Sequence, residues 1–163
     1  MAPRPPVPPV EDVVRRLKSE HLSLLASVDA TGRPELAAVS WIRGRPPQEA
    51  DLMVGWRSRF VRNLAHRKDV CLAVFFESVF TLSGTAEVVE KLVPGLPVPL
   101  ARVRLTFEGV YDGLFTGGRL VGPPVYEKVY PPKLANLDRL VEERLDGEPV
   151  APALAANTAR HRS

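Results

Sequence analysis

The sequence of 163 residues has little of several features that mark large classes of protein. Its one cysteine, Cys71, excludes a disulfide within the chain and gives no sign of secretion. Its histidines, His21, His66 and His161, lack metal-ligand spacing. No apolar stretch approaches the roughly 20 residues that span a bilayer, and the N-terminal MAPRPPVPPV lacks the apolar core of a signal peptide. These absences predict a cytoplasmic protein with no metal site and no membrane partner.

Charge of one sign is also scarce. The 22 basic and 19 acidic residues leave a net charge of +3, which is too small by itself to imply a polyanionic partner. Apolar residues make up 45% and charged residues 25%, the balance of a soluble globular protein with one core. The 17 prolines gather at the start and in apparent loops. We predict a Pro-rich flexible arm over residues 1–9, one domain over 10–148 and a loose tail over 149–163.

The apolar periodicity predicts a mainly β domain. Six strands are expected over 21–28, 34–42, 51–56, 70–77, 79–90 and 101–112, with a turn at Asp29 and Gly32 and a loop over 43–50. Helices are expected over 10–22, 59–68 and 131–147. Strands joined mostly by short turns, with one inserted helix, favour an antiparallel barrel over an alternating parallel sheet.

The residue pattern predicts which side chains are buried in three of these segments. The run VCLAVFFE, residues 70–77, suggests a strand buried on both faces, in which Cys71 is a small core residue rather than a reactive thiol. The strand over 101–112 alternates, with Tyr111 on its apolar face and Arg102 and Arg104 on its polar face. The last helix has an apolar stripe of Leu134, Leu137, Leu140, Val141 and Leu145.

The stretch GWRSRFVRNLAHRKDV, residues 55–70, is the densest group of basic residues. On a helical wheel, Phe60 and its apolar neighbours form a packing face, and Arg59, Arg62, Asn63 and His66 lie opposite. The charged face has three interpretations: it is solvated, it binds one phosphate group, or it binds nucleic acid. Scattered glutamates and the lack of a nucleic-acid-binding motif argue against the third interpretation.

The start of this helix favours the phosphate. Arg57, Ser58 and Arg59 place two guanidinium groups and a hydroxyl where unpaired backbone N–H groups emerge. Arginine also offers paired donors that match phosphate oxygens. Ser58 alone is equally consistent with a plain N-cap that has no ligand.

Taken together, LSLLASVDATGRPELAAVSWI, RSRFVRNLAHRKDVCLAVFF and SGTAEVVE resemble the FMN-binding split barrel of the pyridoxamine 5′-phosphate oxidase-like superfamily. The resemblance covers roughly residues 12–130. It implies a six-stranded antiparallel split β-barrel with flanking helices, paired into a homodimer with a flavin in each interface cleft. It also implies a flavin-dependent oxidoreductase that acts on a small molecule, whose identity it leaves open. Carried over by position, the cofactor-binding residues are Val39, Ser40, Trp41, Val54, Gly55, Arg57, Ser58 and Arg59.

One position departs from the family pattern. Many members have a phosphate-contacting lysine where this chain has Phe60. Some members bind haem or the deazaflavin F420, or have no known ligand, so a non-catalytic protein or one with another cofactor is the alternative. No nucleophile–base pair is visible, which suits a flavin because the cofactor brings its own redox chemistry.

The Gly- and Pro-rich segment over 115–133 has two interpretations. It covers the cleft and sets the substrate through Tyr126, Lys128 and Tyr130, or it is a surface crossover to the last helix. The C-terminal segment EPVAPALAANTARHRS does not match the substrate-binding segment of pyridoxamine 5′-phosphate oxidase, so vitamin B6 oxidation is not inferred.

Overall fold

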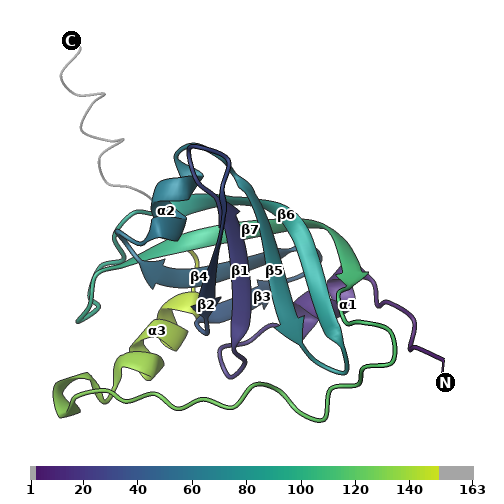
Figure 1. The fold of residues 1–163 in the computed structure, drawn as a ribbon. Coiled ribbons are helices and arrows are strands. Elements are labelled where there is room, and N and C mark those ends of the chain that lie inside the picture. The colour runs from purple at the N-terminus through teal and green to yellow at the C-terminus, as the bar shows by residue number, and fades with distance from the viewer. Residues whose placement is uncertain (1–2, 151–163) are drawn as a thin grey trace.

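The computed structural model describes residues 3–150, which form one sheet of seven antiparallel strands with short helices around it (Figure 1). Of the tail expected over 149–163, residues 151–163 lie outside the described residues. The strands are β1 (Ser23–Val28), β2 (Pro34–Val39), β3 (Ile42–Arg45), β4 (Glu49–Gly55), β5 (Asp69–Phe75), β6 (Val79–Glu90) and β7 (Leu100–Asp112). The helices are α1 (Val10–Arg15), α2 (Arg59–Leu64) and α3 (Leu137–Asp146), with a 3₁₀ turn at Pro132–Leu134.

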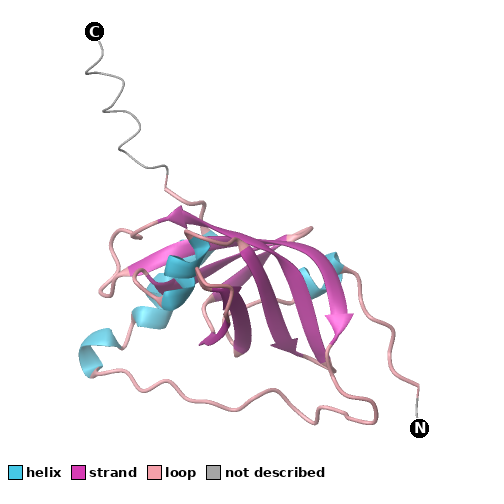
Figure 2. Cartoon of the chain, turned by 45° about the horizontal axis from the view of Figure 1, so that its top comes forward, coloured by secondary structure: helices cyan, strands magenta, loops and turns pink. Residues whose placement is uncertain are grey.

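The sheet has the order β2-β1-β5-β6-β7-β4-β3, so β2 and β3 are its two edges. Only Ser40 and Trp41 separate these edge strands in the chain, and the sheet therefore curls until its edges approach each other (Figure 2). The predicted mainly β, antiparallel architecture is confirmed, with seven strands in place of six. The strand expected over 34–42 is two strands, because the chain turns a corner at Ser40 and Trp41. The loop expected over 43–50 contains the end of β3 and the start of β4.

The main core fills the inside of the curled sheet. Its strands alternate buried and partly exposed residues; in β5, Val70, Leu72 and Val74 are buried while Cys71 and Ala73 are half-buried. The prediction that this strand is buried on both faces is therefore wrong, because only its inner face lies in the core. A second, smaller core lies under α3, where Leu137, Val141 and Leu145 of the predicted apolar stripe pack with Met53, Val93 and Leu100.

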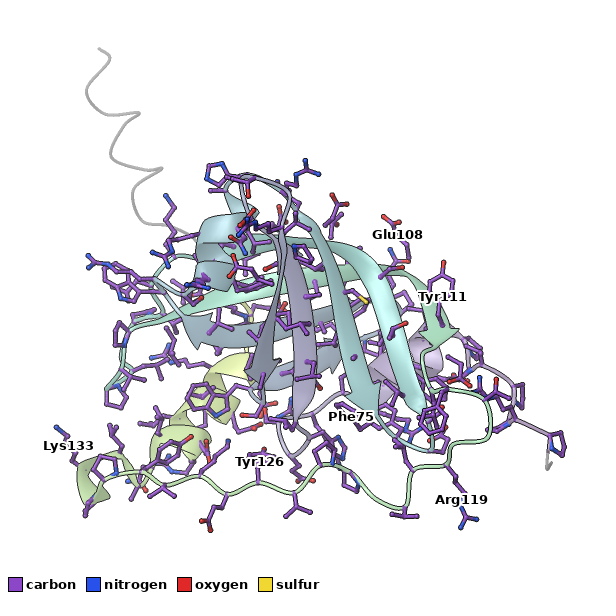
Figure 3. The ribbon with its side chains drawn as sticks, viewed as in Figure 1. Phe75, Glu108, Tyr111, Arg119, Tyr126 and Lys133 are labelled. Atoms are coloured by element: carbon purple, nitrogen blue, oxygen red, sulfur yellow. The ribbon has the colours of Figure 1, made fainter. Side chains whose placement is uncertain are left out.

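Strand β7 departs from strict alternation in two ways. A register shift between Ser83 and Gly84 of β6 leaves Glu108 as an extra residue, which moves Val110 toward the core and Tyr111 outward. Tyr111 is 61% exposed, contrary to its predicted place on the apolar face, and Figure 3 shows it pointing away from the sheet beside Glu108. At the other end of β7, Arg102 was expected on the polar face but is only 1% exposed.

Arg102 is buried because it belongs to an ionic cluster around Asp51 of β4. The Asp51 carboxylate is fully buried and lies 2.6 Å from Arg102 Nη2, 2.8 Å from Arg104 Nε and 2.6 Å from Arg45 Nε. Burial alone would raise the pKa of Asp51, but hydrogen bonds from Arg104 and Arg102 outweigh it and lower that pKa. Arg102 and Arg45 also donate to the Gly147 carbonyl, each at 2.7 Å, and so fix the C-terminal end of α3.

Candidate ligand-binding cleft

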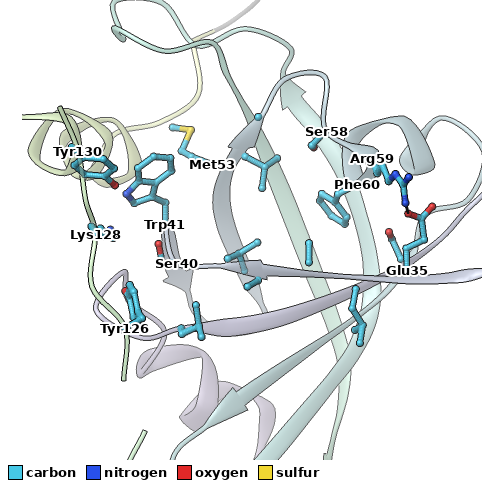
Figure 4. Close-up of a pocket in the computed structure, with 18 residues that line it drawn as sticks. Glu35, Ser40, Trp41, Met53, Ser58, Arg59, Phe60, Tyr126, Lys128 and Tyr130 are labelled. Atoms are coloured by element: carbon cyan, nitrogen blue, oxygen red, sulfur yellow. Dashed lines mark hydrogen bonds and ion pairs between the residues drawn. The ribbon is translucent and has the colours of Figure 1, made fainter. Parts of the chain in front are cut away.

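A cleft of about 560 Å³ opens beside the edge strand β2. Its walls are β2, the corner after it, the end of β4, the start of α2 and one side of an extended segment (Figure 4). We call residues 113–131, which connect β7 to the 3₁₀ turn, the strap. The lining is mainly apolar, from Leu36, Val39, Val54, Phe60 and Met53. A largely apolar cleft with a few polar groups at its ends is the usual form of a small-molecule site.

The structure brings seven of the eight predicted cofactor residues into this lining. They are Val39, Ser40, Trp41, Val54, Gly55, Ser58 and Arg59. Arg57 is the exception, because its guanidinium stacks over the Trp56 ring at 4.3 Å from the ring centroid, outside the cleft. Only one of the two expected guanidinium groups therefore lines the cleft.

At the α2 end, Ser58 caps the helix by accepting a hydrogen bond from the Val61 amide at 3.3 Å. Arg59 is 78% exposed at its side chain and pairs with Glu35 of β2 at 3.2 Å. Glu35 was missed in the sequence, because nothing in its own strand indicates that it faces this arginine. Phe60 is 4% exposed and lies in the main core, as its place on the packing face predicted.

The predicted charged face of this helix needs one correction. Asn63 is 6% exposed and donates to Ser27 Oγ at 2.9 Å and to Glu35 Oε1 at 3.4 Å. It is a buried structural residue rather than part of a solvated or ligand-binding face. The helix itself ends at Leu64, four residues earlier than expected.

At the opposite end, Asp138 in the first turn of α3 collects three donors on one oxygen. Oδ1 accepts from Trp41 Nε1 at 2.8 Å, Lys128 Nζ at 2.8 Å and the Tyr130 hydroxyl at 3.1 Å. Partial burial would raise the pKa of Asp138, but the bonds from Lys128, Trp41 and Tyr130 lower it on balance. Burial, followed by the hydrogen bond to Asp138, raises the pKa of Tyr130 to about 12.

The strap residues Tyr126, Lys128 and Tyr130 all line the cleft, which agrees with the first interpretation of residues 115–133 as a cover. Lys128 Nζ also lies 5.3 Å from the centroid of the Trp41 ring. Asp138 was missed in the sequence, since its only visible feature was an acidic residue early in a helix. Whether the strap sets a substrate stays a prediction.

Other candidate residues lie away from the cleft. Cys71 is half-buried, and burial raises the pKa of its thiol. His21 packs edge-on against Phe76, His66 is exposed, and His161 lies outside the described residues. Within residues 3–150, no group of three or more His, Cys, Asp or Glu is placed to hold a metal ion, and no helix is long and apolar enough to cross a membrane.

The fold resembles that of several solved structures. HupZ of Group A Streptococcus is 17% identical, over 68% of this chain and 98% of that protein, with a TM-score of 0.53. A putative pyridoxamine 5′-phosphate oxidase of Lactobacillus delbrueckii is 20% identical, over 56% and 84% of the two chains, with a TM-score of 0.50. General stress protein 26 of Bacillus anthracis is 10% identical, over 62% and 88%, also with a TM-score of 0.50.

No protein-family model and no curated protein matches the sequence. The structural matches nevertheless define the class of the fold: the chain has the split-barrel fold of pyridoxamine 5′-phosphate oxidase-like proteins. The resemblance noted in the sequence is confirmed at the level of the fold.

Proposed function

We propose that the cleft binds FMN and that the chain is a flavin-dependent oxidoreductase acting on a small molecule. The observation that carries this proposal is the set of seven predicted cofactor residues around one cleft, with Ser58 and Arg59 at one end and aromatic side chains at the other. The cleft volume of about 560 Å³ suits a ligand of flavin size.

The walls of the cleft fit the ring system of a flavin. Val39, Val54 and Phe60 offer apolar surface for a planar ring. Strand β2 is an edge of the described sheet, so its outer backbone N–H and C=O groups have no partner strand. These groups match the polar rim of an isoalloxazine.

The phosphate end fits less completely, because Arg59 there is already paired. Phosphate binding requires the Arg59 guanidinium to move from Glu35 toward the ligand, which its 78% exposure allows. Phe60 supplies no donor, and the Ser58 hydroxyl can still donate while it accepts from Val61. We therefore expect modest FMN affinity in which Arg59 provides most of the phosphate recognition.

A bound flavin would supply the electron-transfer chemistry, and the chain's own residues would bind and orient it. Glu35 lines the cleft and Asp138 lies behind its opposite end, and each carboxylate is held in an ion pair. Neither is free to act as a proton acceptor while that pair persists. The protein contribution is therefore positioning and exclusion of water rather than acid–base catalysis.

We propose further that the chain is a homodimer with the cleft at its interface. In β2, Ala37 and Ala38 are exposed and Leu36 is 72% exposed, so apolar surface faces solvent along the open side of the cleft. A second copy is the occupant that would cover this surface and close the cleft at once. Substituting Leu36 is the corresponding test, described below.

The test of FMN binding is a titration of ligand-free protein followed by flavin fluorescence, with riboflavin as the ligand control. We expect FMN to bind more tightly than riboflavin, and R59A to remove that preference. R57A is the matched control, because Arg57 is exposed outside the cleft and its loss should leave the preference intact. Unchanged binding in R59A would place the phosphate elsewhere, and an equal loss in R57A would mean that Arg57 also binds the phosphate, contrary to its place outside the cleft.

A ligand other than FMN is the second candidate. The pairing of Arg59 with Glu35 reduces the positive charge available to a phosphate, and the buried, neutral Phe60 adds no cation there. This candidate predicts equal affinity for FMN and riboflavin, or binding of neither. In the latter case F420 and haem are the next ligands to titrate.

A further inference from the structure

Asp138 joins three separate parts of the chain at one end of the cleft. Trp41 comes from the corner between the two edge strands, Lys128 and Tyr130 come from the strap, and Asp138 itself begins α3. One carboxylate oxygen that accepts three donors is a crowded arrangement. Removing that oxygen would leave all three donors without their described partner.

The strap depends heavily on this contact. Among the described residues, positions 119–130 make no backbone–backbone hydrogen bond, and the bonds of Lys128 and Tyr130 to Asp138 are the side-chain hydrogen bonds found there. At its other end the strap begins at Gly113, whose amide donates to the Val79 carbonyl at 2.7 Å. Between these anchors the strap runs as an extended chain, which passes below the strands in the view of Figure 3.

The side chains of the strap alternate around Lys128. Tyr126, Lys128 and Tyr130 face the cleft, whereas Val125 and Val129 are 99% and 84% exposed. This period of two is that of an extended strand, so a single anchored residue fixes the direction of its neighbours. Tyr130 is also held by packing against the smaller core, whereas within residues 3–150 the contacts of the Lys128 ammonium group are the Asp138 carboxylate and the Trp41 ring.

We propose that Asp138 is a positioning residue that latches the strap onto Trp41 and so forms the wall at this end of the cleft. The proposal deepens the FMN-binding proposal, since the wall would exclude water from the ligand that the cleft holds. Asp138 touches no ligand itself in this role; it acts through Lys128, Tyr130 and Trp41.

The test uses ligand-free, full-length protein, so its outcome does not depend on FMN. Limited trypsin digestion reports on the strap, because the chain can be cut after Lys128 in the strap and after Lys91, which is exposed between β6 and β7 and lies outside both the strap and the cleft. D138N is the main variant, since it keeps the shape of the side chain and removes the charge that holds Lys128. E143Q is the matched control on the same helix, where Glu143 pairs only with Arg139 at 2.7 Å.

We expect D138N to speed cleavage after Lys128 about tenfold, the factor that loss of a charge-assisted hydrogen bond produces, with no change after Lys91. Trypsin should cleave E143Q at the same rates as the native chain. In a W56F background, in which Trp41 is the sole tryptophan, acrylamide should quench the fluorescence of D138N more strongly. Y130F, which removes one donor without a charge change, should have a smaller effect in both assays and serves if D138N does not fold.

Native rates of cleavage after Lys128 in both D138N and Y130F would overturn the proposal. So would an equal increase at Lys91, because that result would indicate general loosening of the fold. Failure of FMN to bind the native chain would refute the proposed function and leave these results standing. If FMN does bind, D138N should weaken the binding of FMN and of riboflavin by the same factor. This result would distinguish a role in the wall of the cleft from a role in phosphate recognition.

Discussion

The buried Asp51 cluster gives the sharpest test of the fold. The substitution D51N keeps the size of the side chain but leaves three guanidinium groups, each within 3.0 Å of the original carboxylate, without their anion. Removing one partner of a buried ion pair costs about 3–5 kcal/mol. For a chain of this length, each kcal/mol lowers Tm by about 2–4 °C, so we expect a loss of about 10 °C.

The assay is urea and thermal unfolding of D51N beside E143Q. Glu143 forms an exposed pair with Arg139 inside one helix, and its loss should cost less than about 0.5 kcal/mol. Because folding lowers the pKa of Asp51, its contribution is present above the unfolded pKa of about 3.9 and is lost as pH falls through the folded value. The difference in the free energy of unfolding between the native chain and D51N should therefore decrease at acid pH. A loss below about 1 kcal/mol at neutral pH would refute the reasoning, since it would mean that water solvates the arginines or that Glu90, which lies 3.8 Å from Arg102 Nη1, pairs with them.

Three further predictions concern the cleft and its surroundings. E35Q should tighten FMN binding about five- to thirtyfold relative to riboflavin, because it frees Arg59 and removes a negative charge worth about 1–2 kcal/mol near the phosphate; unchanged discrimination would exclude a phosphate beside Glu35. L36E should convert the proposed homodimer to a monomer in light scattering with an unchanged circular dichroism spectrum; a monomeric native chain would refute the dimer, and a dimeric L36E would place its interface elsewhere. Tyr130, with its pKa raised to about 12, should stabilise the fold below the unfolded pKa of about 10, and that contribution should fade as pH rises through 12; Y130F should lack this alkaline step in unfolding experiments.

Much of the fold was predictable because it depends on local patterns. Three features depend only on residues close together in the chain: the alternation of β1, the turn at Asp29 and Gly32, and the apolar stripe of α3. The corner at Ser40 and Trp41 was missed because β2 and Ile42 read as one run, whereas the rest of β3, Arg43 to Arg45, has the composition of a loop. A bulge such as that at Glu108 has no reliable local signal, so the outward turn of Tyr111 was missed as well.

The site was predictable only in part, for a related reason. Residues carried over from a family pattern fell around one cleft, since the fold fixes where strand ends and the start of α2 lie. The partners of those residues were not predictable. Glu35, Asp138 and Asp51 act through contacts with residues 24, 97 and 51 positions away, respectively, and such pairs leave no periodic trace in one sequence.

Helix α3 makes contacts at both of its ends, so a substitution near one end should affect residues near the other. Its last turn is fixed by Arg45 and Arg102 of the Asp51 cluster, while its first turn presents Asp138 to the strap and to Trp41. Ten residues of helix, about 15 Å, therefore connect the buried Asp51 cluster beneath the C-terminal end of α3 to the wall of the cleft. A variant of Asp51 that still folds should bind ligand differently without touching it, and the residues that control specificity in this chain should extend along α3 into the protein interior.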